Sequence, residues 1–202
     1  MKIYDSKTAP NPRRVRIFLA EKGVAVPYEE VDIVKADNRS ADFRRKNPLG
    51  TLPVLELDDG TCIAESVAIC RYFEETHPEP PLMGMDARDR AIVEMWQRRM
   101  ELELFIPITQ VFRNIHPFFA GRIPQVAEYG EVCRTAAEAR LAWLDTVLAA
   151  REFIAGDRYT IADITALCGI DFGRVSKIRI QPGQTNLARW YAAVSARPSA
   201  KA

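Results

Sequence analysis

Residues 47–57 read Asn47-Pro48-Leu49-Gly50-Thr51-Leu52-Pro53-Val54-Leu55-Glu56-Leu57, and the other predicted elements are arranged around them. Proline has no amide hydrogen, so Pro53 belongs at the first residue of a strand, where its peptide bond can be cis. Such a bend would leave the backbone N–H and C=O of Leu52 unpaired and facing outward. About ten residues later, Glu65-Ser66 begins a helix, whose free N–H groups attract anions. Two interpretations stay open: a plain hairpin with a helix cap, or a site that joins a backbone edge to an anion cradle.

The composition is that of an ordinary globular protein. The 202 residues are 48% hydrophobic and 27% charged, and a net charge of +1 gives no general attraction to nucleic acid or anionic membrane. No apolar run reaches membrane-spanning length, and the first residues enter a strand pattern without the apolar segment of a signal peptide. We therefore expect a cytoplasmic protein that binds neither nucleic acid nor membrane.

The cysteines and histidines show no CxxC pair and no metal-like spacing. They are Cys62, Cys70, Cys133, Cys168, His77 and His116. Their pattern is typical of buried, reduced thiols in the cytosol. We expect no bound metal.

The first part of the chain predicts an α/β domain. The expected elements are a strand at 2–5, a helix capped by Asn11 and ended by Gly23, a strand at 27–33, a short helix within 37–46, strands at 53–57 and 61–64, and a helix at 65–76. Asp58-Asp59-Gly60 between two strands favours an antiparallel hairpin. The order is βαβαββα, and we assign it to a domain at 1–78. A stiff proline-rich linker follows at 79–86.

The second part, 87–202, predicts an all-α domain. The expected helices cover 87–114, with a kink at Pro107, and then 126–150, 160–175 and 186–196. At the third of these, Thr160 and Asp163 have the spacing of a capping box, which is a folding element and not a catalytic pair.

Four local patterns, taken in this order and spacing, resemble the cytosolic glutathione S-transferase family over nearly the whole chain. The first is the loop-to-helix run at 8–23, and the second is the stretch at 47–55. The third is Glu65-Ser66 with Ile69, Tyr72 and Phe73 after it, and the fourth covers 155–163. The resemblance implies a thioredoxin-like N-terminal domain, a helical C-terminal domain, a homodimer, and glutathione as co-substrate.

The resemblance also implies a glutathione site. Leu52, before Pro53, would pair its backbone with the cysteinyl unit as a one-residue form of β-augmentation. Ser66 would bind the γ-glutamyl carboxylate with its N–H and hydroxyl, and Glu65 would face the ammonium. Several classes supply a cation for the glycine carboxylate from the position of Gly50, which cannot serve here. Arg39 is our first candidate for that cation, and Lys35 is the second.

The resemblance leaves the thiol-activating residue open. A cysteine-type thiol has a pKa of about 8.5, so a hydrogen-bond donor is needed to favour the thiolate. The family's usual serine position aligns with Ala9, and no cysteine lies in residues 1–61. Among the donors Tyr4, Ser6, Thr8 and Asn11, we favour Thr8 and Asn11 equally as the catalytic residues. Arg13 and Arg14 could add positive potential, although such arginines are more often solvated or paired across a dimer interface.

The family places the electrophile pocket between the two domains. The candidate lining residues here are Trp96, Arg99, Met100, Phe112 and His116, each of which could equally be a core residue. We expect a glutathione transferase that acts on a small electrophile, with possible peroxide reduction by glutathione. The alternative is a non-catalytic glutathione-binding or regulatory protein, which the missing serine favours. The maleylacetoacetate isomerase branch is a weaker option, because its serine- and cysteine-containing loop is absent.

Overall fold

The computed structural model describes the whole chain, Met1–Ala202, which separates into two compact units. Unit 1 contains Met1–Leu82 and Lys201–Ala202, and unit 2 contains Met83–Ala200. The α/β part followed by a helical part is the fold class predicted from the sequence. The finer domain limits, 1–78 and 87–202 around a linker, stay a prediction.

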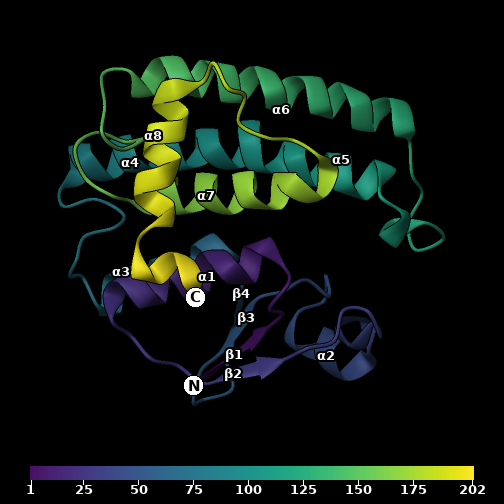
Figure 1. Ribbon diagram of the computed structural model, residues 1–202. Coiled ribbons are helices and arrows are strands. Elements are labelled where there is room, and N and C mark those ends of the chain that lie inside the picture. The colour runs from purple at the N-terminus through teal and green to yellow at the C-terminus, as the bar shows by residue number, and fades with distance from the viewer. The chain divides into compact units, whose positions relative to one another are not determined.

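Unit 1 is a four-stranded mixed sheet with helices on both faces (Figure 1). Its elements are β1 (Lys2–Asp5), α1 (Pro10–Lys22), β2 (Tyr28–Glu30), α2 (Ala41–Lys46), β3 (Val54–Glu56), β4 (Cys62–Ala64) and α3 (Ser66–Thr76). The strand order is β2-β1-β3-β4. Strands β1 and β2 are parallel, whereas β3 is antiparallel to both β1 and β4. The predicted order βαβαββα is confirmed.

The two faces of the sheet bury different side chains, because successive residues of a strand point to opposite faces. Tyr4 and Val54 form one cluster with Phe43 of α2. Ile3 and Leu55, both completely buried, point to the other face, along which α1 and α3 lie side by side (Figure 1). Because the sheet packs between these two layers, the ends of its strands are held in place, and the candidate site lies at one of these ends.

Helix α1 begins two residues before the predicted start. Ala9, in extended conformation, is the N-cap and makes no side-chain cap, so the prediction of Asn11 as the cap is wrong. Prolines at positions 10 and 12 explain the shift, because their fixed φ favours the helical first turn and neither has an N–H to leave unpaired. The other end is as predicted: Gly23 closes the helix with φ +65°.

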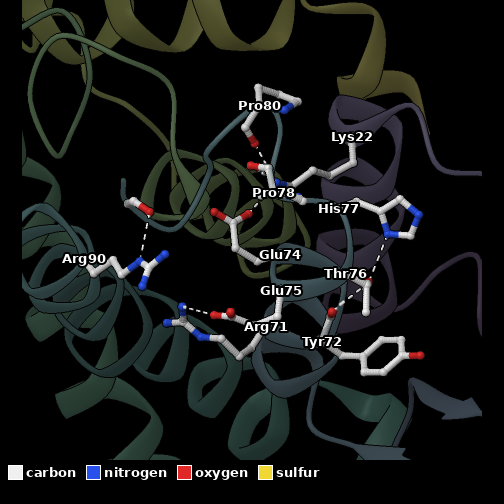
Figure 2. A network of polar contacts seen from close by, with 11 residues as sticks. Lys22, Arg71, Tyr72, Glu74, Glu75, Thr76, His77, Pro78, Pro80 and Arg90 are labelled. Carbon is white, nitrogen blue, oxygen red and sulfur yellow. Dashed lines mark hydrogen bonds and ion pairs between the residues drawn. The ribbon is translucent and has the colours of Figure 1, made fainter. Parts of the chain in front are cut away.

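The buried side chain of Lys22 joins α1 to α3 through an ion pair and to the proline-rich segment after α3 through hydrogen bonds (Figure 2). The Lys22 Nζ atom lies 2.5 Å from Glu74 Oε2, and the Lys22 side chain is 0% exposed. The same ammonium donates to the carbonyl oxygens of Pro78 at 3.2 Å and Pro80 at 2.6 Å. Three acceptors therefore surround one buried cation.

Unit 2 consists of helices packed around α7. Its helices are α4 (Ala87–Met100), α5 (Ile106–Ile115), α6 (Ala127–Leu148), α7 (Ile161–Gly173) and α8 (Thr185–Ser195). The residues from Ile161 to Ile170 are all buried, which makes α7 the core element of the unit. No helix in the structure combines the length and the apolar character needed to cross a membrane.

The long helix predicted at 87–114 is interrupted before Pro107. A π-helical segment, Glu101–Phe105, separates α4 from α5, and Pro107 lies in the first turn of α5. Proline cannot donate to the carbonyl four residues earlier, and its ring crowds that carbonyl. The wider π turn accommodates the ring, so the predicted kink takes the form of a π-helical segment.

The predicted capping box at the start of α7 is confirmed. The Thr160 N–H donates to Asp163 Oδ2 at 2.9 Å, and Asp163 Oδ1 accepts from Trp190 Nε1 at 2.8 Å and from the Ile154 N–H at 3.0 Å. Burial raises the pKa of Asp163 to about 6, against the opposing effect of these donors. One carboxyl group thus links α7, α8 and the turn before α7.

Candidate functional site

The strand register of unit 1 brings the predicted site segments to one end of the sheet. Tyr4 faces Val54 in the β1–β3 pair, and Val54 faces Ala64 in the β3–β4 pair. Both pairs are antiparallel, so Leu52, two residues before Val54, lies at the same end as Ser66, two residues after Ala64. The turn that leads from β1 into α1 leaves from this end as well.

Leu52 carries the backbone edge that the sequence predicts. The Leu52–Pro53 peptide bond is cis, and strand β3 starts after it at Val54. Neither the N–H nor the C=O of Leu52 has a hydrogen-bond partner within the chain. The preceding turn is held by the buried Asn47, whose Nδ2 donates to the carbonyl oxygen of Thr51 at 2.9 Å. A half-buried residue with an unpaired donor and acceptor can pair with an extended peptide.

Helix α3 begins at Ser66, directly after Glu65. Glu65 has φ +68°, a left-handed conformation that is uncommon for a residue with a side chain and often occurs at functional sites. The exposed Glu65 side chain makes no hydrogen bond or ion pair within the chain, whereas Ser66 is only 5% exposed. The first N–H groups of α3 and one carboxylate therefore lie together, as a γ-glutamyl group with both charges would require.

Arg14 lies beside Ser66 at the candidate site, a placement that was not predicted from the sequence. Its side chain is 1% exposed, so the expectation of a solvated or interface arginine is wrong. Its Nη1 donates to Ser66 Oγ at 2.7 Å and to Asn11 Oδ1 at 3.2 Å. The signal was present in the helical spacing, because Arg14 falls on the same face of α1 as Ile17 and Phe18, both buried.

Asn11 and Thr8 have different surroundings near the start of α1. Pro10 and Pro12 carry no N–H, and the Arg13 N–H donates to the Ala9 carbonyl at 3.3 Å, which leaves Asn11 with an unpaired backbone N–H in the first turn. The Asn11 amide is oriented by Arg14. Thr8 is exposed in the turn closed by the Ala9 N–H on the Ser6 carbonyl at 3.0 Å. Their roles as thiol ligands stay predictions.

The structure explains why the position of Gly50 carries no cation. Gly50 has φ +63°, and a Cβ atom there would lie 2.7 Å from the carbonyl oxygen of Asn38. Asn38 also donates from Nδ2 to the Gly50 carbonyl at 2.6 Å, which fixes the close approach. Arg39 is exposed and makes no ion pair, whereas the exposed Lys35 lies 3.3 Å from Asp32. Arg39 therefore stays the first candidate for the glycine carboxylate.

The five electrophile-pocket candidates all lie in unit 2. Trp96 is 4% exposed and stacks on Trp143 at 5.7 Å between ring centroids, and Met100 is completely buried. The Arg99 guanidinium lies 4.8 Å from the Trp96 ring. These contacts are those of packing residues, and a role in an electrophile pocket stays a prediction for all three.

The remaining two candidates lie at the end of α5. Phe112 and His116 are in ring contact at 4.6 Å between centroids. His116 accepts a hydrogen bond at Nδ1 from the Phe118 N–H at 3.1 Å, as expected for a residue that ends a helix. His116 also lines a cavity of about 300 Å³ with Ile115 and Pro117. Of the five candidates it is the only one that lines this cavity.

The fold and the site define a thioredoxin-like unit followed by a helical unit, and comparison with known proteins identifies the family. The profile "Glutathione S-transferase, N-terminal domain" matches residues 3–81, and "Glutathione S-transferase, C-terminal domain" matches residues 108–198. The chain is 37% identical over 205 residues to Glutathione S-transferase 2 of Saccharomyces cerevisiae, covering 100% of this chain and 88% of the yeast protein. The chain belongs to the glutathione S-transferase family.

Solved structures give the same result. The crystal structure of Gtt2 from Saccharomyces cerevisiae is 36% identical, with a TM-score of 0.95 and coverage of 100% of this chain and 99% of that one. A glutathione S-transferase domain-containing protein of Marinobacter aquaeolei is 42% identical, with a TM-score of 0.93 and coverage of 98% of this chain and 99% of that one. A Gtt2-class enzyme of Vibrio parahaemolyticus is 39% identical, with a TM-score of 0.86 and coverage of 98% and 95%.

Proposed function

We propose that this protein is a glutathione transferase, which binds glutathione in unit 1 and uses its thiolate to attack a small electrophile. The observation that carries the proposal is the shared strand end in unit 1. There the unpaired backbone of Leu52 lies two residues before Val54, and Ser66 lies two residues after its partner Ala64. An extended peptide with an anionic γ-glutamyl end matches both features.

In this proposal each part of glutathione meets a different group. The Leu52 N–H and C=O pair with the cysteinyl unit, and Pro53 fixes the bend before the strand. The Ser66 N–H and hydroxyl bind the α-carboxylate, and Glu65 binds the α-ammonium. The exposed Arg39 binds the glycine carboxylate. Contacts at both ends of the tripeptide would fix the position of its sulfur.

The thiol then lies near the start of α1, where donors to sulfur lower its pKa. Asn11 can donate from Nδ2 and from its unpaired backbone N–H, and Thr8 can donate from its hydroxyl. The thiol proton leaves to solvent, and the thiolate forms a carbon–sulfur bond as the electrophile expels its leaving group. Peroxide reduction would instead consume two glutathione molecules and yield an alcohol, water and glutathione disulfide.

Initial-rate assays test the proposal directly. Glutathione would be supplied with a panel of aryl halides, isothiocyanates and hydroperoxides, and product formation compared with the uncatalysed reaction. Saturable turnover of at least one electrophile is the expected result. Tight glutathione binding with no turnover across the panel would contradict the catalytic function. The assays with hydroperoxides are the ones that test the peroxidase activity.

We also propose a cytoplasmic homodimer, as is typical of the family. Large apolar side chains stay exposed on this chain, including Leu49 at 75% and, on α6, Tyr129 at 51% and Val132 at 65%. Light scattering after gel filtration would give twice the chain mass of 22.8 kDa for a dimer, and a mass near 22.8 kDa would contradict it. No disulfide joins any two of the four cysteines, in keeping with a reducing compartment, and cell fractionation would test the location.

A further inference from the structure

One nitrogen atom of Arg14 connects the two ends of the candidate site. Nη1 donates to Ser66 Oγ at 2.7 Å and to Asn11 Oδ1 at 3.2 Å. Ser66 begins α3, and Asn11 lies in the first turn of α1. The contact between Arg14 and Ser66 therefore joins two helices through residues that are 52 positions apart in the sequence. The guanidinium is 1% exposed, and a charge is placed in such surroundings only when it is hydrogen-bonded.

The contact with Arg14 determines which way the Ser66 hydroxyl points. The oxygen accepts from the guanidinium, so the hydroxyl hydrogen must be directed to a different partner. Ser66 makes no donor contact within the chain. Its O–H is thus available to an anion at the start of α3, beside the first N–H groups of that helix. A hydrogen bond from a cation to the oxygen also makes the hydroxyl a stronger donor.

The contact with Arg14 orients Asn11 in the same manner. An amide group has an acceptor oxygen on one side and a donor nitrogen on the other. Because Oδ1 faces the guanidinium, Nδ2 faces away from it, and both of its hydrogens are available. The Asn11 oxygen is not used as a helix cap, since Ala9 occupies that position.

We propose that Arg14 is a positioning residue that couples the γ-glutamyl end of the site to thiol ionisation. This role rests on the proposed glutathione transferase function. Arg14 directs the Ser66 hydroxyl at the α-carboxylate and the Asn11 amide at the sulfur, and it does both through Nη1. Removal of Arg14 therefore weakens binding at one end and raises the pKa of the bound thiol at the other.

The test compares Arg14→Met with wild type and with Arg45→Met as the matched control. Arg45 is an exposed arginine of α2 in the same unit, and its ion pair with Asp42 is solvent-exposed. Two quantities are measured: the affinity for S-methylglutathione, which has no thiol, and the pKa of bound glutathione from thiolate ultraviolet absorbance against pH. Thermal unfolding reports whether each variant folds.

We expect Arg14→Met to bind S-methylglutathione at least tenfold more weakly, equivalent to about 1.4 kcal/mol. We also expect the pKa of the bound glutathione thiol to rise toward 8.5, the ordinary value for a cysteine-type thiol. Arg45→Met should change neither quantity. A folded Arg14→Met protein with wild-type affinity and a wild-type thiol pKa would overturn the role of Arg14. Wild-type protein that binds neither ligand would overturn the proposed function and this role together.

A second measurement applies whether or not Arg14→Met folds. In a double-mutant cycle of Asn11→Ala and Ser66→Ala, S-methylglutathione affinity is the readout. Coupling through Arg14 predicts that Asn11→Ala weakens binding of this thiol-blocked ligand and that the two effects are not additive. If Arg14 had only a structural role, the two substitutions would act independently on the affinity for S-methylglutathione. Additive effects, with no effect of Asn11→Ala on that affinity, would therefore contradict the proposal.

Discussion

Replacing Lys22 with methionine tests the buried ion pair that holds the proline-rich segment in unit 1. The side chain of Lys22 is 0% exposed and that of Glu74 is 8% exposed, and their charged atoms are 2.5 Å apart (Figure 2). Methionine has a similar length and no charge, so Lys22→Met removes the cation and leaves the volume nearly unchanged. The Glu74 carboxylate would lose its ammonium, and the carbonyls of Pro78 and Pro80 would lose a donor.

The magnitude follows from the burial of both charges. Removing one partner of a buried pair costs about 3–5 kcal/mol, because the other charge loses its compensation in a medium of low dielectric. Replacing both partners with apolar groups is often nearly neutral. We therefore expect Lys22→Met to lower the free energy of unfolding of unit 1 by about 3–5 kcal/mol, and the double variant Lys22→Met/Glu74→Met to recover at least about half of that loss.

The assay must report on unit 1, because Trp96, Trp143 and Trp190 all lie in unit 2. Hydrogen exchange at the amides of Ile3 and Leu55, both in the sheet core, reports the opening free energy of unit 1 directly. A loss below about 1 kcal/mol in Lys22→Met would refute the reasoning. A double variant no more stable than the single one would also refute it, since the compensation of charge would then not be the cause.

Two further predictions concern Gly50 and Asp163. Gly50→Ala should lower the free energy of unfolding, measured in urea, by at least about 1–2 kcal/mol, because φ +63° disfavours a Cβ and that atom would lie 2.7 Å from the Asn38 carbonyl oxygen. Gly60→Ala is the matched control, since Gly60 also has positive φ but no atom would lie within 4 Å of its Cβ. Equal losses of stability in the two variants would exclude the clash with Asn38 as the cause. For Asp163 the folded pKa of about 6 lies above the unfolded value of about 3.9, so its stabilisation is full below pH 4 and is lost as the pH rises through 6. The difference in unfolding free energy between wild type and Asp163→Asn should therefore fall by about 2 kcal/mol between pH 4 and pH 7, and a difference that does not vary with pH would contradict the raised pKa.

The element order of the fold could be predicted from local sequence signals, but several boundaries could not. Turn residues, apolar spacing and the entry at Pro53 gave the order βαβαββα and the helical second part. The start of α1 was misplaced because Asn11 looked like a cap, whereas two prolines in the first turn move the cap to Ala9. The π-helical segment Glu101–Phe105 was not foreseen, since a proline signals a disturbance and not its form.

Only part of the candidate site could be predicted from the sequence, and the reason is physical. Leu52 and Ser66 are identified by backbone features, a proline at a strand entry and a helix start, which are visible in a single sequence. Arg14 acts through its side chain across 52 residues of chain, and only the packing of α1 against α3 reveals that contact. The Gly50 conformation likewise depends on a carbonyl from a separate turn.

A crystal structure of the protein with bound glutathione tests the central claim most directly. We predict that the cysteinyl unit lies within 2.7–3.2 Å of the Leu52 N–H nitrogen and carbonyl oxygen, at hydrogen-bonding distance. The γ-glutamyl carboxylate should lie at the same distance from the Ser66 nitrogen and hydroxyl. Glutathione bound elsewhere, or bound with no contact to Leu52, would contradict the account.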